Sequence, residues 1–326
     1  MSESSRSYLK VQYDVRPSKQ IERRMLIDAF QLMSEEGFKI RKYTYVGMGS
    51  IHFYDFAILH RFFGVNSMIS VEIHKDIEKR IHFNNPYSGC IKAKVGVEIG
   101  EIIQKLERDK QYFVWLDYDN TLSQEMLEDI TQSASILAEG SLLLVTVDTE
   151  KPKSIDPSRI DLPATNEETQ DYYFEIGANY DHVLAKYKDP SRFDEKVLVD
   201  INIDLISAAF NQGVNGRDLT FMPIFNFVYA DGHRMLTIGG IIVGSKSRRK
   251  LEKSDLKDTV YSRFSFKNEP YFIRVPKITR KERLYLDSAM PCDDTWSPSE
   301  FEIRHEDIQS YREIYRFYPA YTEMLV

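Results

Sequence analysis

Acidic side chains stand at the ends of several short apolar runs. Glu72 closes the run S-M-I-S-V-E-I, Asp117 and Asp119 follow F-V-W-L, and Asp148 follows S-L-L-L-V-T-V. Short apolar runs without polar alternation predict strands of a parallel sheet that is covered on both faces. Because ligands bind at the carboxyl ends of such strands, we expect these acids to gather around one binding site.

A glycine turn follows the first of these runs, in the stretch T-Y-V-G-M-G-S-I-H-F-Y-D-F. Gly47 and Gly49 let the backbone turn tightly and approach a ligand, and the helix after them points its N–H groups at that ligand. The dinucleotide-binding pattern needs a third glycine where His52 stands, which disfavours a dehydrogenase. The pattern G-x-x-x-x-G-K-[ST] is absent, which disfavours a phosphate-loop nucleotidase. By themselves, the two glycines are explained equally well as a simple tight turn.

Glu72 adds a second feature of a nucleoside site. It ends the second predicted strand, where a carboxylate can accept hydrogen bonds from both hydroxyls of a ribose. The alternative is a solvated acid at the end of a strand. Taken together with the two glycines and the repeated alternation of strand and helix, Glu72 favours a cofactor that carries a nucleoside.

Strand-like and helix-like segments alternate five times before residue 149. The expected strands cover residues 43–46, 67–73, 90–95, 113–116 and 141–147, and the expected helices cover residues 17–36, 53–63, 75–83, 99–107 and 125–137. A further helix is expected at 204–210. Two strand-like runs, 220–229 and 234–243, flank Asp231-Gly232, a strong hairpin-turn signal. The pattern predicts an α/β protein whose mostly parallel sheet ends in an antiparallel hairpin.

Segments of other composition interrupt or flank this region. Residues 149–198 are polar and contain several prolines, so we expect an insertion over the sheet edge. The expected division is a helical segment at 1–40, the sheet domain at 41–245 with that insertion, and a helical appendage at 246–326. Helices are expected in the appendage at 279–289, after a capping-box pattern, and at 306–317.

The composition is that of an ordinary globular chain. It has 326 residues and a net charge of -7, which argues against a general electrostatic grip on nucleic acid but is compatible with a local basic patch. No apolar run reaches the roughly 18–20 residues of a membrane span, and the first residues show no apolar signal region. The two cysteines, Cys90 and Cys292, match no metal spacing. We therefore expect a cytoplasmic protein with reduced thiols and no contact with a membrane.

The motifs resemble those of a known superfamily. The stretches Y-V-G-M-G-S, S-V-E-I and V-W-L-D-Y-D, with the closing D-G hairpin, are similar to class I S-adenosylmethionine-dependent methyltransferases. The chain is most similar to a group of bacterial proteins labelled "putative O-methyltransferase", which share an R-P-x-K-x-I-E-R helix, here Arg16 to Arg23. The resemblance covers residues 15–245. It implies a Rossmann-like sheet of seven strands, with helices on both faces, and leaves the methyl acceptor open.

The resemblance also implies roles for individual residues. The methionine part of S-adenosylmethionine would be wrapped by Gly47, Gly49 and Ser50. The ribose would be held by Glu72, and the adenine would be bordered by Ile73, Val97 and Glu98. The amino-acid end and the transferred methyl would face Asp117 and Tyr118. Ile51 departs from the superfamily, which often has a small residue there, so we expect a tighter or shifted loop.

Methyl transfer to a hydroxyl or ammonium needs alignment of the acceptor and removal of its proton. Asp117 and Asp119 are the candidate catalytic bases. Cation-dependent O-methyltransferases place acids after the fourth strand and an Asp-Asn pair after the fifth, whereas Asp148 is followed by Thr149. Three carboxylates could hold magnesium. We nevertheless expect no metal, and strand-end acids that bind cofactor or solvent.

Two other motifs have simpler explanations. Asn84-Asn85-Pro86-Tyr87 looks like the N-P-P-Y signature of adenine methyltransferases, which belongs after the fourth strand. Here it follows the helix after the second strand, where we expect it to end that helix and turn the chain. His52, at the mouth of the expected site, could shuttle a proton, but an ordinary helix-start histidine is the default.

Two further functions stay open from the sequence. The fold could be a catalytically silent cofactor-binding or scaffold module in a bacterial system such as phage defence. The stretch Y-R-F-Y-P-A-Y-T would then contact a protein partner, and a homodimer is compatible with the sequence. A nucleic-acid methyltransferase would instead use the basic cluster that contains Arg248 and Arg249. A second basic face, which we expect to be solvated, is formed by Arg16, Lys19, Arg23 and Arg24.

Overall fold

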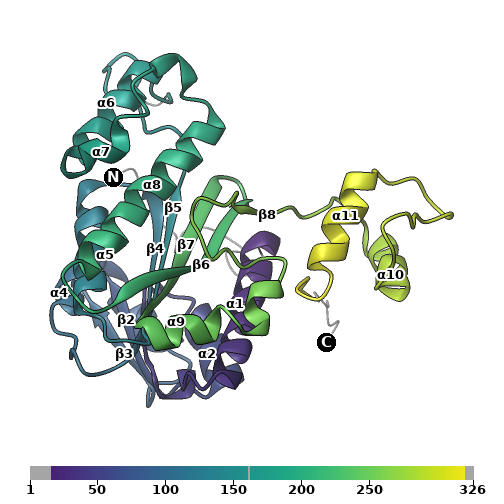
Figure 1. The fold of residues 1–326 in the computed structure, drawn as a ribbon, viewed down its shortest axis with the longest axis horizontal. Helices are drawn as coiled ribbons and strands as arrows, with labels where there is room; N and C mark the ends of the chain where they lie inside the picture. Colours follow the sequence, from purple (N-terminus) through teal and green to yellow (C-terminus); the bar gives the residue numbers. More distant parts are fainter. Residues whose placement is uncertain (1–15, 161, 320–326) are drawn as a thin grey trace.

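The computed structural model describes residues 16–160 and 162–319, and its centre is an eight-stranded sheet (Figure 1). The strand order is β3-β2-β1-β4-β5-β7-β6-β8. The strands are β1 (Thr44–Gly47), β2 (Ser67–Glu72), β3 (Ile91–Val95), β4 (Tyr112–Thr121), β5 (Leu142–Asp148), β6 (Thr220–Ala230), β7 (Arg234–Val243) and β8 (Tyr271–Ile273). The first five are parallel to one another, and β7 is antiparallel to both β5 and β6.

The predicted α/β class, the mostly parallel sheet and the closing antiparallel hairpin are confirmed. The sheet has eight strands where seven were expected, because β8 pairs in parallel with β6 at the sheet edge. β8 has only three residues, Tyr271–Ile273, and comes from the segment after residue 245. Three residues are too few for a period-2 pattern to stand out from their surroundings.

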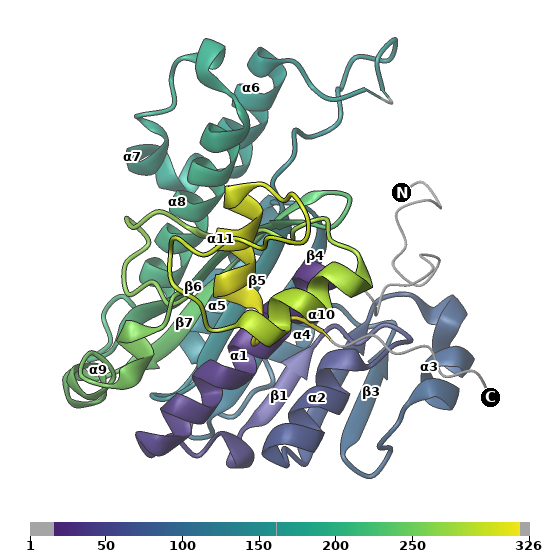
Figure 2. The same ribbon diagram turned by 90° about the vertical axis from the view of Figure 1, so that its right-hand side faces the viewer.

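Helices cover both faces of the sheet. α1 (Pro17–Glu35), α2 (Tyr54–Phe63) and α3 (Glu78–Asn84) supply apolar side chains to one core. α4 (Ile99–Ile103), α5 (Gln124–Ile136) and α8 (Glu195–Val214) supply the other. Figure 1 shows α4, α5 and α8 on one side of the strands and α1 and α2 on the other, and Figure 2 shows α1 and α2 in front of the strands. No helix in the described ranges is long and apolar enough to cross a membrane.

The strand that carries Asp117 is longer than its apolar part. The expected strand ended at residue 116, but β4 continues to Thr121, which pairs with Asp148 of β5. The register shifts between Asp117 and Thr121. The polar residues look like a loop in the sequence, yet the strand pairs with β5 again at Thr121. This irregularity places Asp117 where the ladder between β4 and β5 is broken.

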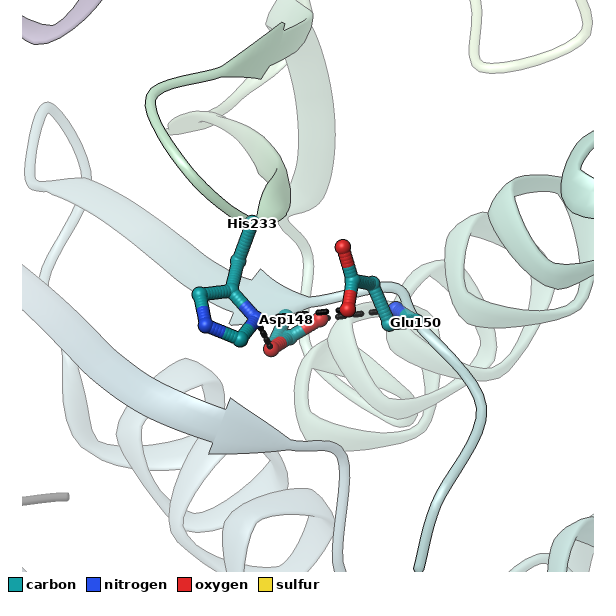
Figure 3. Close-up of side chains that lie close together, drawn as sticks. All are labelled: Asp148, Glu150 and His233. Atoms are coloured by element: carbon teal, nitrogen blue, oxygen red, sulfur yellow. Dashed lines mark hydrogen bonds and ion pairs between the residues drawn. The ribbon is translucent and has the colours of Figure 1, made fainter. Parts of the chain in front are cut away.

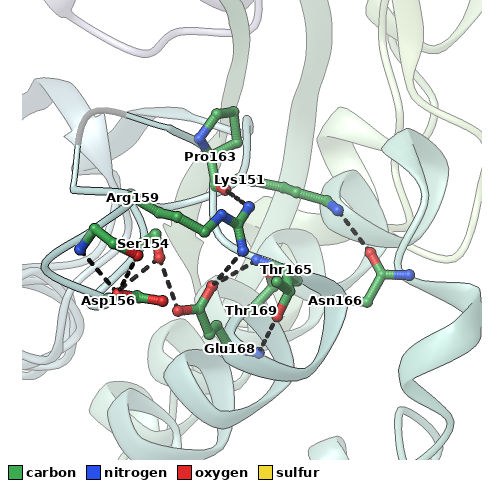
Figure 4. Close-up of polar contacts among 10 residues, drawn as sticks. Lys151, Ser154, Asp156, Arg159, Pro163, Thr165, Asn166, Glu168 and Thr169 are labelled. Carbon is green, nitrogen blue, oxygen red and sulfur yellow. Dashed lines mark hydrogen bonds and ion pairs between the residues drawn. The ribbon is translucent and has the colours of Figure 1, made fainter.

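The polar stretch 149–198 is built around short helices, α6 (Asn166–Ile176) and α7 (Asp181–Leu184), and includes the start of α8. Its first part is held by side-chain hydrogen bonds (Figure 4). Thr165 and Glu168 form a capping box at the start of α6, and Glu168 Oε1 also accepts a hydrogen bond of 2.8 Å from Ser154. The helix expected at 204–210 is the middle of α8, which begins at Glu195 after the cap residue Asp194.

The C-terminal helices are α9 (Ser245–Leu251), α10 (Arg280–Ala289) and α11 (His305–Ile314). The predicted capping box of Thr279 and Glu282 starts α10. Ile314 and Phe317 are buried in the same core as α1. The end of the stretch Y-R-F-Y-P-A-Y-T lies outside the described residues.

Candidate functional site

A cavity of about 520 Å³ lies where β1, β2 and β4 end. Its volume is within the range of roughly 300–1,000 Å³ of small-molecule sites. Hollows of about 670 and 770 Å³ occur along α8 and beside the C-terminal helices, away from these strand ends. The strand-end cavity is lined by nearly all the residues that the sequence singled out, namely Gly49, Ser50, Glu72, Ile73, Val97, Glu98, Asp117, Tyr118 and Asp119. Gly47 ends β1 and is not part of the lining.

The cavity is strongly acidic. Among the described residues, its lining contains one arginine, Arg23, and two histidines, His52 and His74. Against these stand seven carboxylates: Asp55, Glu72, Glu98, Asp117, Asp119, Glu125 and Asp129. A cleft lined by one sign of charge attracts ligands of the opposite sign. The lining therefore favours a cationic ligand over a nucleotide phosphate.

The glycine loop is shaped by close packing. A Cβ on Gly49 would lie 2.3 Å from Ser70 Oγ, and one on Gly47 would lie 2.3 Å from the Tyr45 hydroxyl. Ser50 has a left-handed backbone with φ of 45°. Ile51, the residue that departs from the superfamily, is only 8% exposed and packs into the core of α1 and α2 rather than lining the cavity. Its larger side chain therefore takes no space from a ligand.

The end of β2 presents one polar and one apolar group to the cavity. Glu72 Oε1 accepts a hydrogen bond of 2.9 Å from the backbone N–H of His74. This bond fixes the carboxylate at the strand end. Ile73 is 52% exposed although it is a large apolar residue, and its exposed side chain lines the cavity. An exposed apolar surface beside an anchored carboxylate suits a ligand with a flat apolar ring and a polar sugar.

The basic residues of α1 contradict the prediction of a solvated face. Lys19 and Arg23 are only 5% and 3% exposed, whereas Arg24 is exposed. Lys19 Nζ lies 2.8 Å from Asp117 Oδ1 and 3.0 Å from Glu22 Oε2. Burial raises the pKa of the Glu22 carboxyl, an effect that the nearby Lys19 charge opposes. The prediction is wrong because helical spacing alone does not show which charged residues meet buried partners.

Arg23 joins α1 to the start of α2 at the cavity wall. Its Nε donates to Asp55 Oδ1 at 2.5 Å, and Nη2 lies 3.3 Å from Oδ2. The guanidinium also stacks over Tyr54, 4.7 Å from the ring centroid. Sequence reasoning missed Arg23, Tyr54 and Asp55 as part of the site. The shared R-P-x-K-x-I-E-R motif, which ends at Arg23, was a signal for Arg23, and Tyr54 and Asp55 stand just after the glycine turn in the sequence.

Tyr118 and Asp129 form a second hydrogen-bonded pair in the lining. The Tyr118 hydroxyl donates to Asp129 Oδ2 at 2.9 Å. Burial raises the pKa of both groups, and for Tyr118 the Asp129 charge adds to the effect. Tyr118 therefore stays a neutral hydrogen-bond donor at neutral pH. Asp129 comes from α5 and carried no motif in the sequence.

Asp148 belongs to a different group of side chains from Asp117 and Asp119. It lies with Glu150 and His233 at the turn between β6 and β7 (Figure 3), and within the described ranges this trio is the only set of three potential metal ligands. His233 Nδ1 lies 3.4 Å from Asp148 Oδ2 and 3.2 Å from Glu150 Oε2. The three-carboxylate set considered from the sequence is therefore not assembled.

Two other sequence motifs lie away from the cavity. Asn85 Oδ1 accepts from the backbone N–H of Tyr87, and Asn85 Nδ2 donates to the carbonyl of Ile91. These bonds form a turn after α3, in line with the structural explanation of this stretch. The basic cluster of Arg248 and Arg249 lies in α9, which follows the end of β7. Because β7 is antiparallel to β5, this helix starts at the amino ends of the parallel strands, opposite the cavity.

Comparison with known proteins supplies the family. A family described as "Putative O-methyltransferase" matches residues 11–326, almost the whole chain. The chain belongs to this family. The family agrees with the enzyme class and with the cofactor, S-adenosylmethionine, that the resemblance implied. None of the curated proteins compared with the chain matches it.

Solved structures of methyltransferases match the chain at low identity and with low TM-scores. The O-methyltransferase TomG of Streptomyces achromogenes, in complex with S-adenosylmethionine, is 16% identical over 73% of this chain and 94% of its own, with a TM-score of 0.37. An O-methyltransferase family protein of Burkholderia thailandensis is 13% identical over 64% of this chain, with a TM-score of 0.33. The match spans 53%, about half, of the Burkholderia protein's length.

The residues around the cavity fit S-adenosylmethionine. Its sulfonium and ammonium outweigh its single carboxylate, so the cofactor carries a net positive charge that suits an acidic lining. Ile73 presents an exposed apolar surface to the cavity, and the carboxylate of Glu72 lies next to it in the lining. Gly49, which has no Cβ, lies in the loop between them and Asp117.

Proposed function

We propose that the protein transfers the methyl group of S-adenosylmethionine to a hydroxyl oxygen of an acceptor that enters the strand-end cavity. The observation that supports this most is the convergence of the residues named by the motifs on one acidic cavity. Gly49 and Ser50 would wrap the methionine part, Glu72 would hold the ribose, and Asp117 would receive the amino-acid end. Ile73, Val97 and Glu98 would border the adenine.

The cofactor supplies an electrophilic methyl on a sulfonium, which is already a good leaving group. The protein's residues must therefore align the acceptor oxygen with that methyl and accept its proton. Of the two candidate bases, Asp117 is the one that we assign to the amino-acid end of the cofactor. We therefore assign the proton to Asp119, two residues further along β4 and also in the lining. The carbon–oxygen bond forms as the carbon–sulfur bond breaks, and the sulfur keeps the electron pair.

Isothermal titration with S-adenosylmethionine tests the cofactor site. We expect binding by the wild-type protein and a loss of at least about tenfold in affinity for Glu72→Ala, since the ribose loses its charged acceptor. Glu101→Ala is the matched control, because that side chain is 59% exposed on α4 and outside the lining. Absence of wild-type binding, or equal affinity for Glu72→Ala and wild type, would contradict the proposal.

Transfer is tested by incubating the protein with a methyl-labelled cofactor and a bacterial cell extract. We expect label in an O-methyl product, and we expect Asp119→Asn to lower transfer while cofactor affinity is kept. Cofactor binding without transfer to any component of the extract would instead favour a catalytically silent module.

A further inference from the structure

Lys19 lies in an environment that is costly for a lysine. It belongs to the first turn of α1 and is only 5% exposed. Its ammonium lies 4.4 Å from the ring centroid of Trp115 and 5.8 Å from that of Tyr229. An ammonium removed from water is tolerated only when its charge is paired and hydrogen-bonded. The partners of Lys19 therefore explain why a lysine occupies this position.

Two carboxylates share the Lys19 ammonium. Glu22, one turn further along α1, is fully buried and has no contact with the cavity, whereas Asp117 is part of the cavity lining. The distances from Nζ are 3.0 Å to Glu22 Oε2 and 2.8 Å to Asp117 Oδ1. Lys19 itself is not in the lining. The contact with Asp117 thus links Lys19 to the cavity.

This contact restricts Asp117 to one orientation. A free aspartate turns about two side-chain bonds, but a short charge-assisted hydrogen bond to a fixed donor selects one arrangement. The donor is fixed because the Lys19 side chain lies against Trp115 and its backbone N–H is bonded to Asp231 at 3.0 Å. Groups that bind a ligand need to be held to within roughly 0.5 Å of the productive geometry. Because Asp117 stands beside the register shift in β4, the contact with Lys19 adds to the order that the backbone supplies.

We propose that Lys19 is a positioning residue, which holds the Asp117 carboxylate in the orientation that receives the amino-acid end of the cofactor. This inference rests on the proposed function, because it assigns a ligand to Asp117. It makes α1, and not only the strand ends, part of the cofactor site. It also predicts that the effect of Lys19 falls on the amino-acid end of the cofactor, since Asp117 is the lining residue whose carboxylate Lys19 contacts.

Two ligands that differ at the amino-acid end provide the test. S-Adenosylhomocysteine carries the adenosine and the amino acid, whereas 5′-methylthioadenosine keeps the adenosine and the sulfur and lacks the amino acid. We expect Lys19→Met to weaken S-adenosylhomocysteine by about 10- to 100-fold, the range for loss of a hydrogen bond to a charged group. The affinity for 5′-methylthioadenosine should stay within about twofold. Isothermal titration of the full chain measures both.

Matched variants separate positioning from damage to the fold. Arg24→Met removes a charge from the same helix at an exposed position and should change neither affinity. In an Asp117→Asn background, Lys19→Met should cause no further loss of S-adenosylhomocysteine affinity, because the two residues act as one unit. If Lys19→Met alone does not fold, the double variant Lys19→Met, Glu22→Gln takes its place. The second substitution removes the Glu22 carboxylate, which Lys19→Met would leave buried without its ammonium partner.

Several results would overturn the inference. Equal weakening of both ligands by Lys19→Met would indicate general damage to the cavity. Unchanged or tighter binding of S-adenosylhomocysteine would show that Lys19 does not support the amino-acid end. If the wild-type protein bound neither ligand, the proposed function would fail, and the assignment of Lys19 would fail with it.

Discussion

The carboxylate of Asp231, in the turn between β6 and β7, accepts a hydrogen bond of 3.0 Å from the backbone N–H of Lys19. The same carboxylate lies 3.4 Å from the N–H of Ser18. The first N–H groups of a helix have no partners within it, and α1 has no side-chain cap of its own. Asp231 supplies that cap from a distant hairpin. The hairpin-turn residue thereby fixes the helix that carries Lys19 into the site.

Replacement of Asp231 by alanine tests this remote cap. We expect the free energy of unfolding to fall by about 1 kcal/mol, the usual effect of losing a helix N-cap. Urea unfolding measures it, and Asp109→Ala, at an exposed position in a turn, is the control. An Asp231→Ala protein as stable as wild type would contradict the capping role.

Glu22→Gln should increase the free energy of unfolding, and the increase should be larger at neutral pH than at acidic pH. Burial raises the pKa of Glu22 in the folded state above its value in the unfolded chain. Below the unfolded pKa the carboxyl is protonated in both states and folding has no ionisation cost. As the pH rises through the folded pKa, the folded state loses stability relative to the unfolded chain, at about 1.4 kcal/mol for each unit of difference.

Urea unfolding of Glu22→Gln at about pH 4 and about pH 8 measures this difference around the ordinary carboxyl range. The stabilisation relative to wild type should appear at the higher pH and shrink at the lower one. Glu35→Gln, exposed near the end of the same helix, should show no such trend. A gain that is equal at both pH values would mean that ionisation of Glu22 is not its source.

Gly49→Ala should destabilise the glycine loop. The added Cβ would lie 2.3 Å from Ser70 Oγ and 3.0 Å from a ring carbon of Phe56, so the loop or its neighbours must shift. We expect a loss of about 1–3 kcal/mol, as for other overpacked sites. Ser70→Ala in the same chain removes the closest atom and should restore most of the loss.

Thermal or urea unfolding of both Gly49 variants checks this, with Gly89→Ala as the control because no atom lies within 4 Å of a Cβ there. If Gly49→Ala were as stable as wild type, the packing explanation would be wrong, and only ligand binding would remain as a reason for the glycine.

Neutralising Arg248 and Arg249 together should leave the affinity for the cofactor within about twofold of that of the wild type. The reason is that exposed charges separated by more than a Debye length of about 8–10 Å are screened from each other. These residues lie in α9, at the edge of the sheet opposite the cavity. Titration with S-adenosylmethionine checks this. A several-fold loss of cofactor affinity would show that α9 is coupled to the site. If the wild-type protein bound nucleic acid in a salt-sensitive way and this variant did not, the nucleic-acid methyltransferase alternative would be favoured.

The sequence by itself determined the sheet and the position of the site. Apolar strands and amphipathic helices are local patterns, and parallel strands bring their carboxyl ends to one edge. Glu72, Asp117 and Asp119 could therefore be placed together although they come from different strands. Their roles toward the cofactor remain predictions.

Only the tertiary structure decided which other groups join that site. Lys19 meets Asp117 across 98 residues, and its N–H meets Asp231 across 212. Residues so far apart leave no spacing pattern, and a lysine on a helix looks solvated until its burial is known. The three-residue β8 and the separation of Asp148 from Asp117 were hidden for the same reason. Local periodicity fixes the elements, whereas burial and charge pairing are properties of the packed chain.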